Sequence, residues 1–179
     1  MLYLYSIIFL GELVMTKKVN HELEPYYNKD SKILILGSIP SVKSRELGFY
    51  YMHPQNRFWK TLSRVYEENI PITIDDKKKF LKRHKIALWD TIKSCHIKGS
   101  SDSSITNVKI NDINKILKKT EVEKIFTTGR KSFDLYNKYC LAKTKKEARY
   151  LPSTSPLYCP KGIDDILYNE YKIIKEITK

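Results

Sequence analysis

Apolar residues along this chain fall into short continuous runs separated by segments with helical spacing. Four runs are predicted to be strands: 32–37, 86–89, 124–128 and 149–151. The first, Lys32–Gly37, is apolar at every position between its ends and stops at a glycine. Such a run is typical of a strand that is buried on both faces of a parallel sheet.

The segments between these runs place apolar residues three or four positions apart, which predicts helices. One helix is expected over Arg57–Glu67, and a second begins at Asp75 and Asp76, where acidic side chains suit the positive end of the helix dipole. Asn111 is expected to cap a third. Two more are expected after Gly129 and from Ile163 onward.

Strands that alternate with helices predict an α/β fold. We expect a three-layer α/β/α sandwich with a short central, mainly parallel four-stranded sheet, and with 33–36 at its centre. Ligands of such sheets bind at the carboxyl ends of the strands. The loops that follow Leu36, Trp89, Thr128 and Leu151 are therefore expected to carry the site.

The length of 179 residues suits one domain, expected over 15–179. Residues 1–14 are apolar, lack a basic flank and are too short to span a bilayer. We interpret them as a non-native or disordered extension that precedes a natural start at Met15. The alternative is a short membrane-associated segment.

The formal net charge is +13, from 33 Lys and Arg against 20 Asp and Glu. This excess favours nucleic acid as a partner and an anionic membrane surface second, although a biased genome composition is an alternative explanation. Cys95, Cys140 and Cys159 lie far apart in the sequence, which suits reduced thiols in a cytoplasm and offers no metal or iron–sulfur ligand set. No metal and no cofactor are expected.

The segment Gly48–Trp59 combines many aromatic residues with His53 and Asn56. Aromatic faces suit a flat base that has been extracted from its stack. Phe58 and Trp59 have helical spacing and are predicted to lie in the core, which leaves Tyr50 or Tyr51 to contact a base.

Four segments resemble the uracil-DNA glycosylase superfamily. Tyr51–Lys60, YMHPQNRFWK, resembles the segment of mismatch-specific uracil-DNA glycosylases in which an aromatic residue stacks on the flipped base, and Leu151–Pro156, LPSTSP, resembles the motif that enters the minor groove. Asp90–Cys95 and Gly99–Ile105 are similar to the hypoxanthine-DNA glycosylase branch. The resemblance implies a monofunctional DNA glycosylase that removes hypoxanthine. Uracil or mispaired thymine is the alternative substrate, and a non-catalytic nucleic-acid-binding module is the alternative of another class.

The chain departs from the superfamily at three points. Ile39 stands where several families have Asp or Asn, the second motif lacks its histidine, and Leu157-Tyr-Cys-Pro160 follows that motif in place of small residues. In the hypoxanthine branch the key amide is the Asn of the His-Pro-x-Asn segment, which is Asn56 here. Asn56 is therefore the candidate catalytic residue, with a loop-holding amide or helix cap as the structural alternative.

The resemblance also implies how the base is bound. Tyr51 would stack on it, and the loop that contains Gly37, Ser38 and Ile39 would stabilise the departing base through backbone N–H groups. Asp90 would accept a hydrogen bond from N1–H of hypoxanthine, unless it instead holds backbone N–H groups of the Thr91–Ser94 turn. Asp102 is expected to organise its own loop.

The expected partner is DNA that contains a deaminated base, bound by a monomer without stable membrane association. Hydroxyl and basic groups would contact phosphates, and Leu157 or Tyr158 would fill the vacated stack. The candidate DNA-binding residues are Ser41, Arg130, Lys131, Ser153, Thr154, Ser155, Leu157 and Tyr158.

The charge leads to a testable prediction. Because lysine and arginine that neutralise phosphates release counterions, we expect DNA affinity to fall steeply as the salt concentration rises. Titrations of a labelled duplex at two or more ionic strengths measure this dependence. An affinity that does not change with salt would argue against DNA as the partner.

Overall fold

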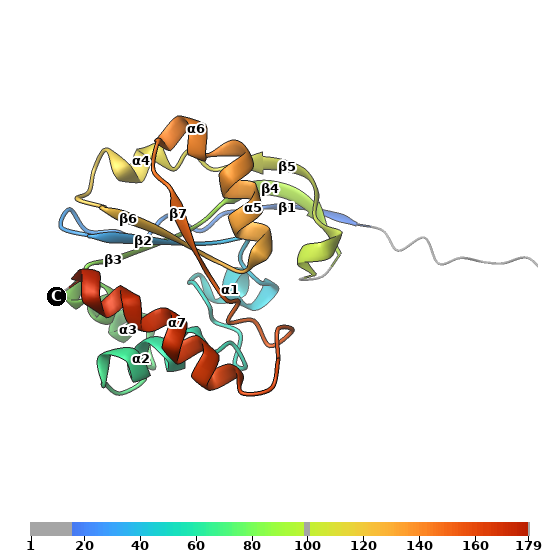
Figure 1. Cartoon of the computed structure of the whole chain (residues 1–179). Coiled ribbons are helices and arrows are strands. Elements are labelled where there is room, and N and C mark those ends of the chain that lie inside the picture. The colour runs from blue at the N-terminus through green and yellow to red at the C-terminus, as the bar shows by residue number, and fades with distance from the viewer. Residues whose placement is uncertain (1–15, 99–100, 179) are drawn as a thin grey trace, which may run out of the picture.

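The computed structural model describes residues 16–98 and 101–178, and its centre is a four-stranded parallel sheet (Figure 1). The strands are β2 (Ile33–Gly37), β3 (Ile86–Asp90), β6 (Lys124–Thr128) and β7 (Ala148–Leu151), in the order β3-β2-β6-β7. Every residue of β2 is buried, and β2 pairs with a strand on each side. The predicted parallel sheet with 33–36 at its centre is confirmed. Residues 1–14, for which an extension was expected, lie outside the described residues, and so do Gly99 and Ser100.

Helices cover both faces of this sheet, which confirms the predicted α/β/α sandwich (Figure 1). One layer consists of α2 (Phe58–Tyr66), α3 (Ile74–Arg83) and α7 (Ile163–Thr178). The other contains α4 (Asn114–Leu117), α5 (Arg130–Tyr139) and α6 (Leu141–Thr144). A further short helix, α1 (Val42–Leu47), lies in the long loop after β2, where the sequence pattern had predicted none.

The helix boundaries follow local chemistry. Thr73 and Asp76 form a reciprocal capping box at the start of α3, which satisfies backbone N–H groups that the helix itself leaves free. Asn111 does not cap α4, so that prediction was wrong: α4 begins after Ile113, without a side-chain cap. Asn111 Nδ2 instead donates to the carbonyl oxygens of Asp90 at 2.9 Å and Ile92 at 3.2 Å, and so connects the end of β3 to the strand that follows.

A second, antiparallel sheet lies beside the first, and the sequence analysis missed it. Its strands are β1 (Lys17–Asn20), β4 (Ile92–Ile97) and β5 (Thr106–Ile110), in the order β1-β4-β5, with the short 3-10 helix Asp102–Ser104 between β4 and β5. β1 and β5 are largely polar and exposed, so their sequences carry little hydrophobic signal. They form because backbone groups pair with β4, which is distant from β1 in the sequence.

None of the helices in the described ranges combines the length and the apolar character that a membrane crossing needs. Cys95 and Cys140 are buried and Cys159 is exposed, and all three are free thiols.

The burial of β2 leads to a stability prediction. Ile35 is fully buried in this central strand, whereas Ile72 is 76% exposed. Ile35→Ala should lower the free energy of unfolding by about 2–5 kcal/mol, because it leaves a cavity in a close-packed core. Ile72→Ala, with the same change in side chain, should stay within about 0.5 kcal/mol of the wild type. Urea denaturation of both variants checks this, and equal losses would contradict the assigned core.

Candidate active site

A pocket of about 580 Å³ lies at the carboxyl ends of the parallel strands, where the fold class predicted it. Its volume is in the usual range for pockets that bind small molecules. Loops that follow β2, β6 and β7 form its walls, together with Asp90 and with residues of the aromatic segment Gly48–Trp59. Every residue predicted for the site lines it: Gly37, Ser38, Ile39, Ser41, Tyr51, Asn56, Asp90, Arg130, Lys131, Ser153, Thr154, Ser155, Leu157 and Tyr158.

The strand register places Gly37 beside Asp90, because these residues are partners at the ends of β2 and β3. A Cβ atom on Gly37 would lie 2.2 Å from Asp90 Oδ1 and 3.4 Å from the Tyr51 hydroxyl. Contacts as short as the first do not occur between non-bonded atoms. The missing side chain of Gly37 therefore leaves room for the Asp90 carboxylate and the Tyr51 hydroxyl at the pocket wall.

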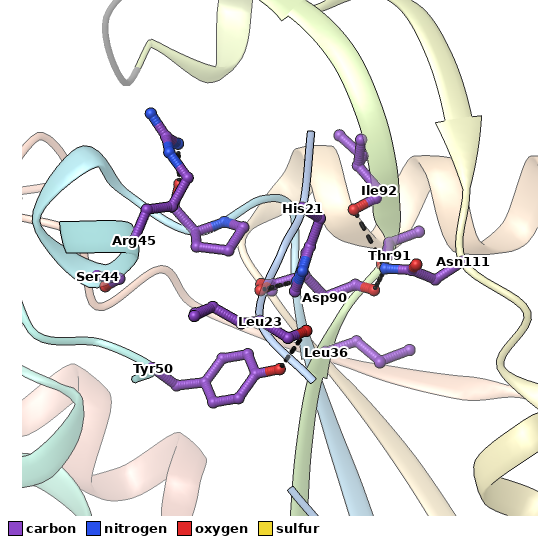
Figure 2. A network of polar contacts seen from close by, with 12 residues as sticks. His21, Leu23, Leu36, Ser44, Arg45, Tyr50, Asp90, Thr91, Ile92 and Asn111 are labelled. Carbon is purple, nitrogen blue, oxygen red and sulfur yellow. Dashed lines mark hydrogen bonds and ion pairs between the residues drawn. The ribbon is translucent and has the colours of Figure 1, made fainter. Parts of the chain in front are cut away.

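The Asp90 carboxylate is buried and forms a hydrogen bond with a histidine that the sequence analysis had not considered (Figure 2). His21 Nε2 lies 2.8 Å from Asp90 Oδ2, and the two side chains are 1% and 5% exposed. The alternative role of Asp90 was to hold backbone N–H groups of the Thr91–Ser94 turn. The N–H groups of Thr91 and Ile92 instead donate to the carbonyl oxygens of Gly37 and Ser38, so the Asp90 carboxylate does not bind them. A single histidine 69 residues from its partner gave no signal in the sequence.

The two candidate tyrosines have different environments. Tyr50 is 2% exposed, and its hydroxyl donates to the Glu24 carbonyl at 2.9 Å, which ties the N-terminal segment to the core. Tyr51 stacks on Phe58, with ring centroids 3.8 Å apart and planes inclined by 11°, and its hydroxyl lies 3.2 Å from Thr128 Oγ1. Burial and the negative charge of Asp90 raise the pKa of Tyr51, so its phenol is neutral at physiological pH.

The backbone of Tyr51 is in the left-handed region, with φ of 55°. A residue with a large side chain rarely adopts this conformation, which costs about 1–3 kcal/mol and tends to occur at functional sites. The contacts with Phe58 and Thr128 hold the ring in spite of that cost. Tyr51 is thus a rigid aromatic part of the pocket wall.

Asn56 lines the pocket and also organises the start of α2. Its Oδ1 accepts a hydrogen bond from the Phe58 N–H at 3.0 Å, and its own N–H donates to the His53 carbonyl at 2.8 Å. The structural role considered for Asn56, an amide that holds the loop at the start of a helix, is therefore present in the molecule. It does not exclude a catalytic role, since an amide oxygen accepts two hydrogen bonds and only one comes from Phe58.

Asp102 is a second carboxylate at the pocket. Ser38 Oγ donates to Asp102 Oδ1 at 2.9 Å, which connects the loop after β2 with the segment between β4 and β5. Desolvation raises the pKa of Asp102, and the charge of Asp90 adds to this, whereas Ser38 and Lys131 act in the opposite direction. This hydrogen bond joins Asp102 to the loop after β2 and not to its own loop, so the expected role of Asp102 within its own loop stays a prediction.

Arg57 holds the loop after β7, a role that the sequence analysis missed. Its Nη1 donates to the carbonyl oxygens of Ser155 at 3.1 Å and Tyr158 at 3.3 Å, and its backbone N–H donates to Thr154 O at 3.0 Å. The side chains at the loop tip stay accessible, with Leu157 77% exposed and Tyr158 38% exposed. Leu157 is thus an apolar side chain exposed to solvent on a loop whose backbone is held by Arg57.

The remaining candidates surround this opening. Arg130 and Lys131 begin α5, and the Arg130 guanidinium lies 4.6 Å from the centre of the Tyr150 ring. Thr154 is 2% exposed, so its side chain belongs to the inner wall of the pocket.

The serines of these loops also have local roles. The hydroxyls of Ser153 and Ser155 accept hydrogen bonds from nearby backbone N–H groups, and the Ser41 hydroxyl caps α1. Ser153 and Ser155 each keep a hydroxyl hydrogen with which they can donate to a ligand, whereas the Ser41 hydroxyl donates to Ser44 Oγ at 3.1 Å.

Within the described ranges, no three His, Cys, Asp or Glu side chains come together as metal ligands would. The pocket is lined by carboxylate, amide, phenol and hydroxyl groups, which can bind and orient a base, a sugar and a water molecule.

Comparisons with known proteins agree on one family. The model of the uracil DNA glycosylase superfamily matches residues 24–162. A hypoxanthine DNA glycosylase of Methanosarcina acetivorans is 35% identical over 130 residues, which cover 72% of this chain and 81% of the relative. A protein of the same name from Methanosarcina barkeri is 35% identical over 111 residues, which cover 60% and 70%.

A solved structure is similar as well. The solution NMR structure of a candidate uracil DNA glycosylase from Methanosarcina acetivorans superposes with a TM-score of 0.72 at 29% identity. The match covers 86% of this chain and 96% of that one.

The contact of Gly37 with Asp90 leads to a prediction about the pocket wall. Gly37→Ala should lower the free energy of unfolding by about 1–3 kcal/mol, because the new Cβ overlaps with Asp90 Oδ1. In an Asp90→Ala background the overlapping oxygen is absent, so the same substitution should cost much less. Thermal unfolding of the wild type, the two single variants and the double variant gives the coupling free energy between the two positions. Additive effects would show that the two residues do not touch.

Proposed function

This chain belongs to the uracil DNA glycosylase superfamily, and from that premise we propose that it hydrolyses the N-glycosidic bond of hypoxanthine in DNA, as a monofunctional enzyme without a cofactor. Two relatives at 35% identity carry the name hypoxanthine DNA glycosylase. The observation that supports the proposal best is the pocket, in which Asn56, Tyr51 and Asp90 lie together at the carboxyl ends of the sheet. Removal of such a base is the first step of base excision repair.

Asp90 is proposed to select the base. Hypoxanthine carries a hydrogen on N1, whereas adenine has a lone pair there, so a carboxylate attracts the first and repels the second. N1 belongs to the six-membered ring and lies away from N9, where electrons accumulate as the glycosidic bond breaks. A carboxylate at N1 can therefore recognise the base without strongly opposing its departure.

Asn56 is proposed to act on the sugar side. As the C1′–N9 bond breaks, its electron pair leaves with the base and positive charge grows on the sugar, so a weakly activated water is a sufficient nucleophile. The free lone pair of Asn56 Oδ1 can orient that water towards C1′. The water oxygen forms the new bond to C1′, one of its protons is released, and the departing base takes up a proton.

The surroundings of the opening suit a DNA duplex with one base extruded. We propose that Tyr51 stacks on the base and that backbone N–H groups of the loop over Gly37, Ser38 and Ile39 stabilise its developing negative charge. Exposed Leu157 would occupy the vacated position in the stack, and Arg130 and Lys131 would bind phosphate. Ser153 and Ser155 would donate further hydrogen bonds, and Ser41 would do so in place of its bond to Ser44 Oγ.

The function is tested with duplexes that differ in a single base. The protein is incubated with oligonucleotides that contain one hypoxanthine, uracil or ethenoadenine, and abasic sites are then cleaved with alkali. We expect the fastest cleavage at hypoxanthine and none at adenine. Faster release of uracil would keep the enzyme class and change the substrate, whereas no release from any duplex would overturn the proposed function.

The roles of Asn56 and Tyr51 lead to a paired prediction. Asn56→Ala should reduce single-turnover excision by about 10²-fold or more while DNA affinity stays nearly unchanged, as expected when one preorganised transition-state contact is lost. Tyr51→Ala should instead weaken binding of lesion DNA by about 1–3 kcal/mol, the value of one aromatic–base stack. A folded Asn56→Ala variant that cuts at the wild-type rate would contradict the assignment. Circular dichroism of both variants serves as the control for folding.

A further inference from the structure

The pair of His21 and Asp90 joins the active-site pocket to the second sheet (Figure 2). Asp90 lines the pocket, whereas His21 follows β1 and is not among the residues that line it. The reaction described above uses Asp90 and does not use His21. A buried imidazole that contacts a base-reading carboxylate therefore needs an explanation of its own.

The two oxygens of Asp90 have different surroundings. Oδ2 lies 2.8 Å from His21 Nε2, and because a carboxylate only accepts hydrogen bonds, Nε2 carries the shared hydrogen. Oδ1 lies on the side of Gly37 and of the Tyr51 hydroxyl, both of which line the pocket. The bond to His21 thus occupies one oxygen and leaves the other directed to the side where a base would bind.

The imidazole itself is held firmly. Its ring lies 6.3 Å from Tyr50 and 6.5 Å from Trp89, in an edge-on arrangement with the latter, and its side chain is 1% exposed. The backbone N–H of His21 donates to the Lys93 carbonyl at 2.8 Å. Because the donor is buried among these groups, its hydrogen bond restrains the rotation of the Asp90 carboxylate.

We propose that His21 is a positioning residue for base recognition, which holds Asp90 so that Oδ1 meets N1–H of the bound base. This inference rests on the proposed function, because it assumes that Asp90 reads the base. Loss of the donor would allow the carboxylate to rotate and would leave Oδ2 without its partner. Misplacement of a recognition group by about 1 Å is enough to reduce a rate by roughly 10²-fold.

Two amide substitutions separate positioning from polarity. His21→Gln keeps a donor at about the distance of Nε2, whereas His21→Asn carries the same amide on a side chain that is shorter by one methylene and does not reach Oδ2. We expect His21→Asn to lower single-turnover excision of hypoxanthine by about 10- to 100-fold, and His21→Gln to restore most of that rate. Affinity for an undamaged duplex should be the same in both variants, because His21 does not contact the DNA-binding surface.

The Asp90→Asn background shows whether His21 acts through Asp90. There, His21→Asn should cause no further loss of excision, since the carboxylate that it positions is already gone. The same fold-loss in both backgrounds would overturn the proposal and make His21 a residue of the fold alone. A wild-type rate in the folded His21→Asn single variant would also overturn it.

An NMR measurement keeps this test independent of activity. In protein labelled with ¹⁵N-histidine, we expect a slowly exchanging Nε2–H signal for His21 that is lost or strongly shifted in Asp90→Asn. An unchanged signal would show that the bond to Asp90 does not exist in solution, and the inference would fail. If the signal behaves as expected but the wild type releases no base from any duplex, the proposed function fails while the His21–Asp90 bond stands.

Discussion

β2 has hydrogen-bonded neighbours on both sides, and its parallel register with β3 and β6 determines where the pocket can form. The register pairs Gly37 with Asp90 and Leu36 with Thr127, so three strands end at nearly the same level. A shift by one residue would turn the side chains at these ends to the opposite face of the sheet. Ile33–Leu36 are fully buried, so such a shift would exchange side chains of different shape on both faces of a close-packed core. The positions of Asp90 and Tyr51 in the pocket therefore depend on the packing of a strand that provides almost no chemistry itself.

Ser132 connects the end of β2 to the start of α5, on another wall of the pocket. Its buried hydroxyl lies 3.0 Å from the Leu36 carbonyl, 2.9 Å from the Gly37 carbonyl and 2.9 Å from Thr91 Oγ1. Ser132 belongs to the first turn of α5, next to the two basic residues at the opening. The groups proposed to bind phosphate and the groups proposed to bind the base are thus fixed to the same strand ends, and their separation is set by the fold.

The sequence allowed prediction of the parts that depend on local pattern. The apolar runs and helical spacing were sufficient for the parallel sheet and its helices, and the residues predicted from the motifs and the strand ends all line the pocket. The pocket also contains residues that were not predicted, such as Thr128 and Asp134. What the sequence could not provide were contacts between distant polar residues. His21 reaches Asp90 across 69 positions, and Arg57 holds carbonyl oxygens about a hundred positions away. β1 and β5 have little apolar character, and Asn111 has the residue type of a helix cap but bonds to carbonyl oxygens instead. In each of these cases the tertiary structure, and not the local sequence, decides the partner.

The separation of these partners has a consequence for synthesis of the protein. A chain emerges from the ribosome N-terminus first, at about 5–20 residues per second. His21 leaves the ribosome several seconds before Asp90, its hydrogen-bond partner. The loop that contains Tyr158 follows later still. During that interval the nascent chain exposes the apolar β2 run without a complete sheet around it. Binding competence should therefore arise only near the end of translation, once β7 has added to the sheet.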